Sequence, residues 1–142
     1  MIYYLDTNIL VYSLFEHKGK EKITHDVLDI LEDCTNLFRT SSICVKEILY
    51  LYKSNNILFK RTKLKSAQEI ITGIKEVNIE IIPITEKHLL KYANLEIYPS
   101  NNDPNDHVII SQAISDKIPL ISSDRDFKNY VSQGLEFIYN KR

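Results

Sequence analysis

Hydrophobic and polar residues follow two alternating patterns along this chain. Short apolar runs, which predict buried strands, occur at residues 2–5, 37–39, 79–82, 119–121 and 135–138. Longer stretches whose apolar residues have helical spacing occur at residues 8–15, 21–33, 42–53, 60–77, 86–95 and 106–116. Strands that alternate with helices favour a parallel sheet covered on both faces. We therefore predict an α/β fold, a three-layer α/β/α sandwich with a mostly parallel sheet of four to five strands.

Composition places the chain among ordinary globular proteins. Its 142 residues are 44% hydrophobic and 26% charged, which predicts a single domain over residues 1–142. No apolar run approaches the roughly 20 residues that span a bilayer. The first residues also lack the basic segment of a secretory signal. We expect a cytoplasmic protein that does not bind membranes, with Cys34 and Cys44 as reduced thiols.

Asp6 is the first acidic residue that falls just after a predicted strand. Ligands gather at the carboxyl ends of the strands in open parallel sheets, so an acid at this position is a candidate site residue. Thr7 and Asn8 follow it. All three residue types also cap helices, so the start of the next helix is an alternative explanation for Asp6. The first strand of such a sheet is usually central, which favours a functional role.

Glu47 lies on the apolar side of the predicted helix 42–53. At about 100° per residue, that side is formed by Ile43, Cys44, Ile48, Leu51 and Tyr52. An ionised carboxylate does not belong there unless a cation or a polar cleft receives it. The alternative is that Glu47 reaches the helix edge or pairs with a buried Arg or Lys.

Asp106 repeats this argument in the helix that follows it. Asp103 is predicted to be the N-cap and Pro104 the first helical residue, so Asp103 is interpreted as structural. Asp106 projects into the middle of the buried stripe, which is predicted to contain Ile109, Ile110, Ala113 and Ile114. The side chains predicted to face away from that stripe are Ser111, Gln112 and Ser115.

Asp124 and Asp126 follow the predicted strand 119–121 as Asp6 follows the first. Capping of a short helix accounts for one of these two acids. We take Asp124 as a site residue and Asp126 as a secondary candidate. Carboxylates that converge on one cleft repel one another, and a divalent ion removes that repulsion. Oxygen ligands suit Mg²⁺ or Mn²⁺, and such a site is suited to hydrolysis of a phosphodiester by an activated water.

Four short motifs, taken together and in order, resemble those of PIN-domain proteins, most of all the VapC-type ribonuclease toxins of toxin–antitoxin pairs. The motifs are Leu5-Asp6-Thr7-Asn8-Ile9-Leu10, Glu47, Asp103-Pro104-Asn105-Asp106-His107, and Ile121-Ser122-Ser123-Asp124-Arg125-Asp126-Phe127. The resemblance implies that Asp6, Glu47, Asp106 and Asp124 bind Mg²⁺ or Mn²⁺. It also implies support from Asp126, Thr7 and Asn8, a homodimer and a neutralising antitoxin partner.

Two residues depart from the pattern of that family. His107 stands where the family very often has Arg after the third acid, and Ser122 stands where Thr is frequent before the fourth. Neither change removes a predicted metal ligand. Substrate contacts are the feature that these departures put in question. The other histidines, His17, His25 and His88, are interpreted as surface or capping positions.

A basic stretch offers a place for nucleic acid in a chain whose net charge is only −1. Residues 48–68 contain no acid, and their basic residues are Lys53, Lys60, Arg61, Lys63 and Lys65. These charges are predicted to guide an RNA backbone toward the acidic cleft. Tyr50 and Tyr52 are suited to stack on unpaired bases. The alternative is a solvated helix face with half-buried tyrosines.

The leading hypothesis is a divalent-metal-dependent endoribonuclease, the toxin of a toxin–antitoxin pair. A second hypothesis is a non-catalytic RNA-binding or interaction module of the same fold, against which the intact acidic set argues. A third is a phosphotransfer domain, since such domains also place an acid after the first strand. The phosphatase pattern requires a second Asp where this chain has Asn8, and the receiver pattern requires a late Lys that is not evident.

Overall fold

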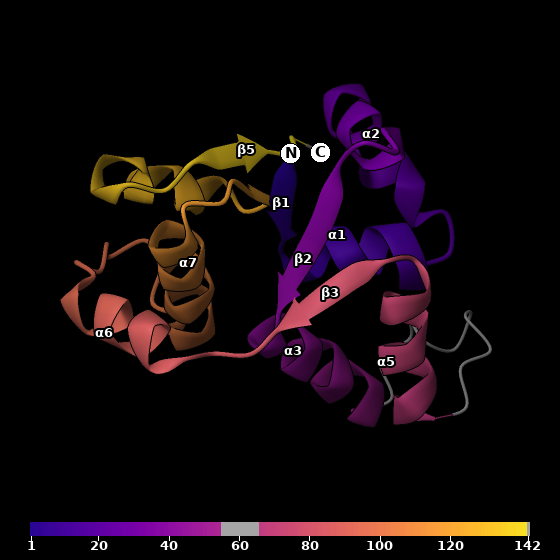
Figure 1. Ribbon diagram of the computed structural model, residues 1–142, viewed down its shortest axis with the longest axis horizontal. Coiled ribbons are helices and arrows are strands. Elements are labelled where there is room, and N and C mark those ends of the chain that lie inside the picture. Colours follow the sequence, from indigo (N-terminus) through magenta and orange to yellow (C-terminus); the bar gives the residue numbers. More distant parts are fainter. Residues whose placement is uncertain (55–65, 142) are drawn as a thin grey trace.

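Five parallel strands form the centre of the molecule. The computed structural model describes residues 1–54 and 66–141. Its strands are β1 (Ile2–Leu5), β2 (Leu37–Ser41), β3 (Ile79–Ile82), β4 (Leu120–Ser122) and β5 (Phe137–Tyr139). They are arranged in the order β3-β2-β1-β4-β5, and every neighbouring pair is parallel. Figure 1 shows β3, β2 and β1 side by side. The first strand is therefore central, as the sequence predicts.

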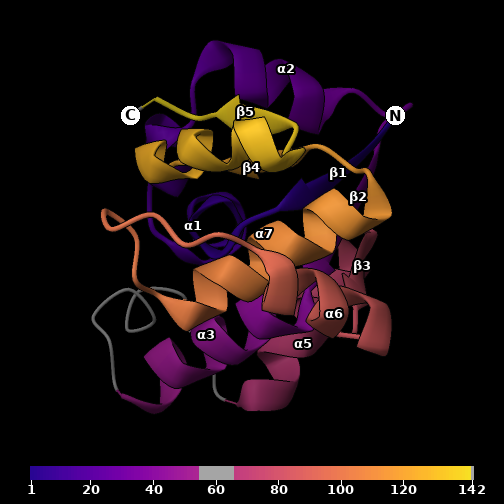
Figure 2. The same ribbon diagram turned by 90° about the vertical axis from the view of Figure 1, so that its left-hand side faces the viewer.

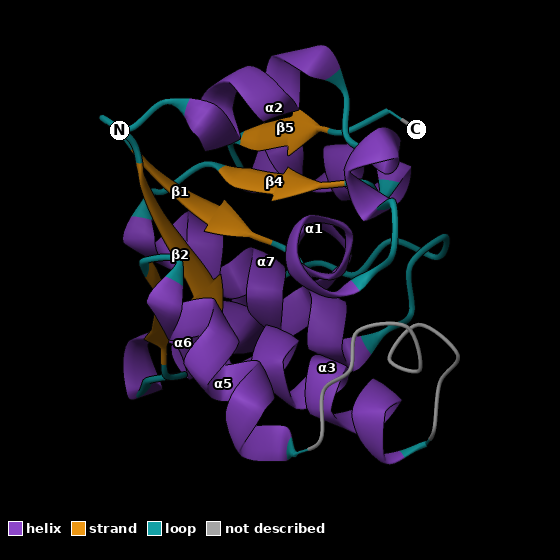
Figure 3. Cartoon of the chain, turned by 90° about the vertical axis from the view of Figure 1, so that its right-hand side faces the viewer, coloured by secondary structure: helices purple, strands orange, loops and turns teal. Residues whose placement is uncertain are grey.

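Helices cover both faces of this sheet. The α-helices are α1 (Thr7–Leu10), α2 (His25–Glu32), α3 (Ser42–Lys53), α5 (Ala67–Glu76), α6 (Glu86–Asn94) and α7 (Pro104–Asp116). The described residues also form one π-helix, η1 (Val11–Phe15), and two 3₁₀ helices, η2 (Gly19–Lys22) and η3 (Arg125–Gln133). Helices α6 and α7 lie on one face, shown in Figure 2, whereas α1, α2 and α5 lie on the other, shown in Figure 3. The predicted α/β sandwich is confirmed.

Side chains in the sequence set where several helices begin. The side chain of Thr24 accepts a hydrogen bond from the backbone at the start of α2, and those of Ser41 and Ser66 do so for α3 and α5. Asp103 caps α7, with Pro104 as its first residue, as predicted. These caps fix the first turns of the four helices, of which α3 directly follows a strand, β2.

The element boundaries differ in places from the predictions. The predicted helix 8–15 is an α-helix only to Leu10 and continues as a π-helix, η1. The predicted helix 21–33 is shorter, because residues 19–22 form the 3₁₀ helix η2. The predicted helix 60–77 begins outside the described residues, and its described part is Ala67–Glu76. Each of these differences lies at an end or a join, where local spacing gives the weakest signal.

Helix α7 is buried more completely than its predicted stripe. Ser111 and Gln112, predicted to face away from the core, are 0% and 1% exposed. The reason is that α7 lies between the sheet and α6, so both of its sides are covered (Figure 2). The donor groups of both side chains find partners: the Ser111 hydroxyl donates to the carbonyl of His107, and the Gln112 amide nitrogen donates to that of Ile82.

Two further predictions concern the environment of the protein. In the described part of the chain, no helix has both the length and the apolar character needed to cross a membrane. Cys34 is exposed, Cys44 is buried, and both are free thiols.

Candidate metal centre

The four predicted acids meet in one cavity at the carboxyl end of the sheet. Asp6 follows β1, Glu47 projects from α3, Asp106 comes from the first turn of α7 and Asp124 follows β4. The cavity has a volume of about 280 Å³. Its walls are formed by Asp6, Thr7, Asn8, Val11, Tyr12, Glu47, Leu51, Asp106 and Asp124. Four segments that are far apart in the sequence thus contribute one carboxylate each.

The Asp6 carboxylate is held in a fixed position by its neighbours. Leu5 is paired with Ile121 in the sheet, so Asp6 and Ser122 leave adjacent strands side by side. The Ser122 hydroxyl donates to Asp6 Oδ2 at 2.6 Å, and the backbone N–H of Thr7 donates to Oδ1 at 2.8 Å. Asp6 therefore caps α1 and lines the cavity at once. The capping interpretation is confirmed, and the role of Asp6 as a site residue stays a prediction.

Asn8 connects the ends of the two central strands. Its amide nitrogen donates to Asp6 Oδ2 at 3.3 Å, and its oxygen accepts from the backbone N–H of Ser123 at 3.1 Å. Asp124 then repeats the arrangement of Asp6, because it caps η3 by accepting from the N–H of Asp126 at 2.9 Å. The two carboxylates that follow β1 and β4 are thus fixed by one hydrogen-bonded network.

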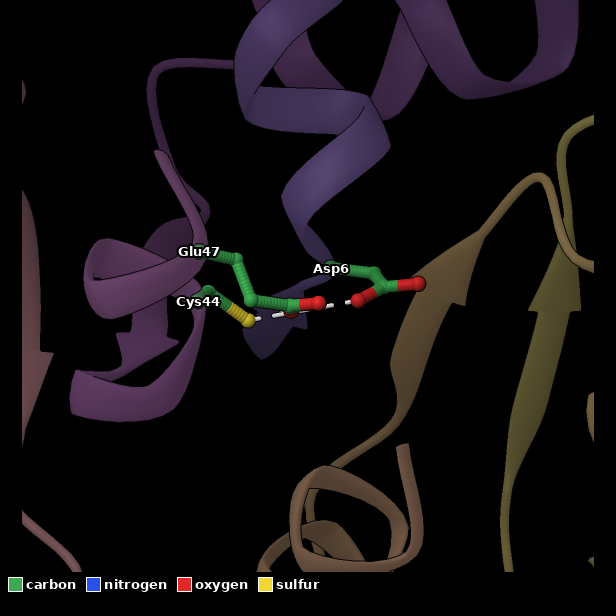
Figure 4. A group of neighbouring side chains, drawn as sticks. All are labelled: Asp6, Cys44 and Glu47. Atoms are coloured by element: carbon green, nitrogen blue, oxygen red, sulfur yellow. Dashed lines mark hydrogen bonds between the residues drawn. The ribbon is translucent and has the colours of Figure 1, made fainter. Parts of the chain in front are cut away.

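Glu47 points from α3 toward Asp6. The Thr7 hydroxyl donates to Glu47 Oε1 at 2.7 Å. The Cys44 thiol, one turn earlier on α3, donates toward Asp6 Oδ1 at 3.9 Å and toward the Leu5 carbonyl at 3.8 Å. Figure 4 shows the Asp6, Cys44 and Glu47 side chains directed at a common point. The apolar face of α3 therefore delivers Glu47 to a polar cleft.

The spacing of the ligand atoms fits a metal ion. One oxygen of Asp6, one of Glu47 and the sulfur of Cys44 lie within 4.8 Å of one another. Glu47 belongs to a second group of the same size, with Asp103 and Asp106. Carboxylate oxygens at this separation reach a shared or adjacent hard cation without rearrangement of the backbone. Glu47 is common to both groups and so lies at the centre of the cluster.

The pKa values of three acids in the cluster are raised above their ordinary values. Burial, aided by the charges of Glu47 and Asp124, raises the pKa of Asp6 to about 6. Burial also raises the pKa of Asp106 to about 8, with contributions from Asp6, Asp103, Glu47 and Asp124. The pKa of Glu47 is raised by burial, although the hydrogen bond from Thr7 opposes the shift. Without a cation, the cavity resists carrying its full negative charge.

Within residues 1–54 and 66–141, no lysine or arginine forms an ion pair with these four acids. The alternative interpretation of Glu47, pairing with a buried basic residue, therefore has no support in that part of the chain. The four carboxylates offer oxygen donors and carry excess negative charge, which fits a divalent ion such as Mg²⁺ or Mn²⁺.

The secondary candidates have different positions. Thr7 and Asn8 line the cavity, as predicted, but Asp126 does not line it, and its backbone N–H serves the cap of η3. His107 is buried beside Tyr130, with its Nε2 bonded to the Asn101 carbonyl at 2.8 Å, and so packs in the interior.

The predicted basic stretch is described only at its start. Lys53 ends α3 and is exposed there. The other four members lie outside the described residues: Lys60, Arg61, Lys63 and Lys65.

Sequence reasoning missed three contributors to the cluster. Ser122 appeared only as a departure from a family pattern, yet its hydroxyl holds Asp6. Cys44 was assigned to the apolar face alone, and Asp103 to capping alone. The sequence does carry a signal for Ser122, because it directly follows the predicted strand 119–121 as Asp6 follows the first predicted strand. The contacts of Cys44 and Asp103 depend on tertiary packing between helices, for which the sequence carries no local signal.

A family model decides what this arrangement belongs to. The model of the PIN domain matches residues 3–132. The chain belongs to the PIN-domain family. None of the curated proteins matches the sequence. The resemblance drawn from the four motifs is thereby confirmed at the level of the family.

Solved structures share the fold over their whole length. VapBC2 from Rickettsia felis, bound to a DNA fragment from its promoter, is 24% identical, with 98% of each chain covered and a TM-score of 0.67. DNA-bound VapBC from Salmonella typhimurium is 17% identical, with 98% of each chain covered and a TM-score of 0.68. VapBC-5 from Mycobacterium tuberculosis, of a toxin–antitoxin family, is 18% identical, covers 97% of this chain and 98% of its own, and has a TM-score of 0.60. At these identities the likeness establishes the PIN fold.

Proposed function

We propose that this PIN-domain protein is an endoribonuclease that depends on Mg²⁺ or Mn²⁺. One observation carries the proposal: four carboxylates from separate segments line one cavity, and burial and mutual repulsion raise the pKa of three of them. A fold gains no stability from such a cluster, so a bound cation and a reaction are its best explanation.

Each side chain of the cavity would have a distinct role in binding the ion or in positioning its ligands. Asp6, Glu47, Asp106 and Asp124 would hold the ion, with Asp6 oriented by Ser122 and Glu47 by Thr7. When bound, the ion supplies a water of lowered pKa and offsets the charge of the phosphate during in-line displacement. Asn8 would keep the Asp6 and Asp124 segments in register through its bonds to Asp6 and Ser123. In the hydrolysis that this site would support, a water oxygen would bond to phosphorus as the ester P–O bond breaks; the water would lose one proton to solvent and the leaving oxygen would gain one from it.

RNA as substrate, a protein antitoxin and a homodimer are further parts of the proposal. The three solved structures named above are VapBC assemblies, and one of them is described as a member of a toxin–antitoxin family. That similarity supports the interpretation of this chain as the toxin half of a pair that acts inside the cell. The alternative, a non-catalytic RNA-binding module of the same fold, is an outcome of the test below.

The test is RNA cleavage by Asp6→Asn. Purified parent and variant are incubated with single-stranded RNA and Mg²⁺ or Mn²⁺, with chelator as a blank. Loss of a ligand is expected to lower the rate by more than about 100-fold, since even outer partners of metal sites are worth 10–100-fold. Asp29→Asn, the same chemical change on the exposed side of α2, is the matched control and is expected to cleave like the parent. Equal cleavage by Asp6→Asn would refute the proposal, and a parent that neither cleaves RNA nor binds Mn²⁺ would favour the non-catalytic module.

A further inference from the structure

We infer that a second hollow beside the metal centre binds an unpaired nucleotide of the RNA, with Tyr50 stacking on its base and Lys46 contacting its phosphate. This inference rests on the proposed function and specifies its substrate as single-stranded RNA. The hollow has a volume of about 390 Å³, and we call it the flank pocket. Its lining residues are Thr7, Lys46, Glu47, Tyr50, Leu51 and Asn105.

The flank pocket is joined to the metal cavity. Three residues line both: Thr7, Glu47 and Leu51. Thr7 and Glu47 are bonded to each other at 2.7 Å, so the boundary between the two spaces is itself part of the metal centre. A nucleotide in the flank pocket is therefore a direct neighbour of the nucleotide whose phosphate reaches the carboxylates.

Helix α3 divides its surface between the two spaces. Glu47 and Leu51 are four residues apart, share one side of the helix and line the metal cavity. Lys46, Tyr50 and Lys53, which are spaced by four and three residues, lie on the adjacent side and are exposed. Lys46 and Tyr50 line the flank pocket, and Lys53 lies beyond it. The helix thus presents a strip of cation, aromatic ring and cation beside the carboxylate that it contributes.

Tyr50 needs an explanation that core packing does not give. Its side chain is 67% exposed at the edge of the pocket, although a tyrosine ring buries a large apolar area when it packs. Stacking on a nucleobase covers such a ring and tolerates any base, because every base has a π face. Bases are free to stack in this way only in unpaired RNA, which makes a single strand the matching substrate.

Charge complementarity points to the same occupant. The acids of the metal cavity repel phosphates, so an RNA strand needs cations beside the cavity to approach it. In the part of the chain that the structure describes, neither Lys46 nor Lys53 forms a salt bridge, and both side chains are exposed. Asn105 adds an amide to the pocket wall, a group that donates to and accepts from base edges.

Binding of a short fluorescent single-stranded RNA, followed by anisotropy in the Asp6→Asn background with Mg²⁺ present, tests the inference without cleavage. Tyr50→Ala is expected to weaken binding about tenfold, whereas Tyr50→Phe keeps the ring and stays within about twofold. Tyr139→Ala, which removes an exposed tyrosine from the far edge strand β5, is the matched control and is expected to leave affinity unchanged. Equal binding by Tyr50→Ala and parent overturns the inference, as does equal loss in Tyr50→Phe.

An abasic scan identifies the contact directly. One base at a time is removed from the RNA; we expect one position to weaken binding by the parent, and that position to have no effect on Tyr50→Ala. Additive losses at every position, or duplex bound as well as single strand, contradict a stacked unpaired base. Lys46→Gln is expected to lower the slope of log affinity against log salt by about 0.7, and Lys117→Gln, at the opposite end of the sheet, to leave it unchanged.

The cleavage assay separates this inference from the proposed function. In the otherwise unaltered protein, Tyr50→Ala is expected to raise KM with little change in kcat. Cleavage that depends on Asp6 but shows a parental KM in Tyr50→Ala overturns the nucleotide pocket alone. Tyr50-dependent binding without any cleavage supports the pocket and refutes the nuclease. Loss of a protein partner's binding in Tyr50→Ala, with RNA affinity unchanged, assigns the pocket to that partner and overturns the inference.

Discussion

The two ends of helix α7 each carry a partly buried aspartate, and the two have opposite electrostatics. Asp106, in the first turn, has a pKa raised to about 8 by burial and by the acids around it. Asp116, in the last turn, has its pKa held below the usual range. Burial alone would raise that pKa too, but hydrogen bonds from Tyr4 and His88 outweigh it. The same residue type on one helix thus has opposite shifts.

The partners of Asp116 explain why. The Tyr4 hydroxyl donates to Asp116 Oδ2 at 2.6 Å. The backbone N–H of Thr85 donates to His88 Nδ1 at 3.1 Å, so the neutral ring carries its proton on Nε2, which donates to Asp116 Oδ1 at 2.9 Å. Lys87 lies 4.0 Å away. The protein itself satisfies this carboxylate.

The dipole of α7 alone would lower the pKa of Asp106 and raise that of Asp116, the opposite of the shifts found. Its positive end favours the charge of Asp106 and its negative end disfavours that of Asp116, each by about 0.3–1 kcal/mol. Direct partners therefore decide the ionisation at both ends. Asp116 has hydrogen-bond donors on both of its oxygens. Asp106 lines the cavity with three other acids, and within the described residues no Lys or Arg forms an ion pair with it. Under the proposed function, a bound cation would supply the missing positive charge.

The largest effect on stability is expected from Asp116→Asn. The amide leaves one of two buried donors, Tyr4 or His88, without an acceptor, which costs about 1–3 kcal/mol of the free energy of unfolding. Urea denaturation measures it, and RNA cleavage is expected to stay near the parental rate. Asp29→Asn on exposed α2 is the control, expected within about 0.5 kcal/mol of the parent. If the two variants were equally stable, the network around Asp116 would contribute nothing.

A smaller effect is expected from pH on the metal-free protein. Asp6, Glu47 and Asp106 bind protons more tightly when folded than when unfolded, because their pKa values are raised. The free energy of unfolding should therefore fall as pH rises from about 5 to 8, by about 1–2 kcal/mol after allowance for solvent in the cavity.

Asp106→Asn provides the comparison for this pH series. It removes the group with the highest of these pKa values, so its stability should depend less on pH and exceed that of the parent at pH 8. Thermal unfolding in chelator at several pH values measures both quantities. The stabilising contribution of Asp116 is complete above about pH 4, because its pKa is lowered, and does not vary in this window. A parent whose stability rises from pH 5 to 8 relative to Asp106→Asn would contradict the account.

The same contrast explains what could be predicted from the sequence. Asp6, Glu47, Asp106 and Asp124 were found because each follows a strand or lies on an apolar helix face, and both are local signals. The network of Asp116 was missed, since its partners are 28 and 112 residues away. His88 was interpreted as a surface or capping residue. It does bond at the cap of α6, but it is 3% exposed, because α6 packs on α7.

The fold shows a similar division. The sequence predicted every strand to within one or two residues and a central first strand, but it did not predict the order of the other strands. The change from α1 to the π-helix η1 and the full burial of α7 could not be predicted, because they depend on what packs against those helices. Local pattern thus places the elements and the acids, and tertiary packing decides which acids find partners.

Calorimetric titration with Mn²⁺ at pH 7 tests the central claim most directly, in the parent, Asp106→Asn and Asp116→Asn. The account predicts that the parent and Asp116→Asn bind the ion with similar affinity. It also predicts that both release close to one proton, because Asp106 loses its proton to the buffer when the ion binds; the release is measured as a dependence of the heat on the buffer. Asp106→Asn should bind at least about tenfold more weakly and release fewer protons. Absence of binding to the parent, or equal binding and proton release by Asp106→Asn, would contradict the assignment of this cluster as a metal centre.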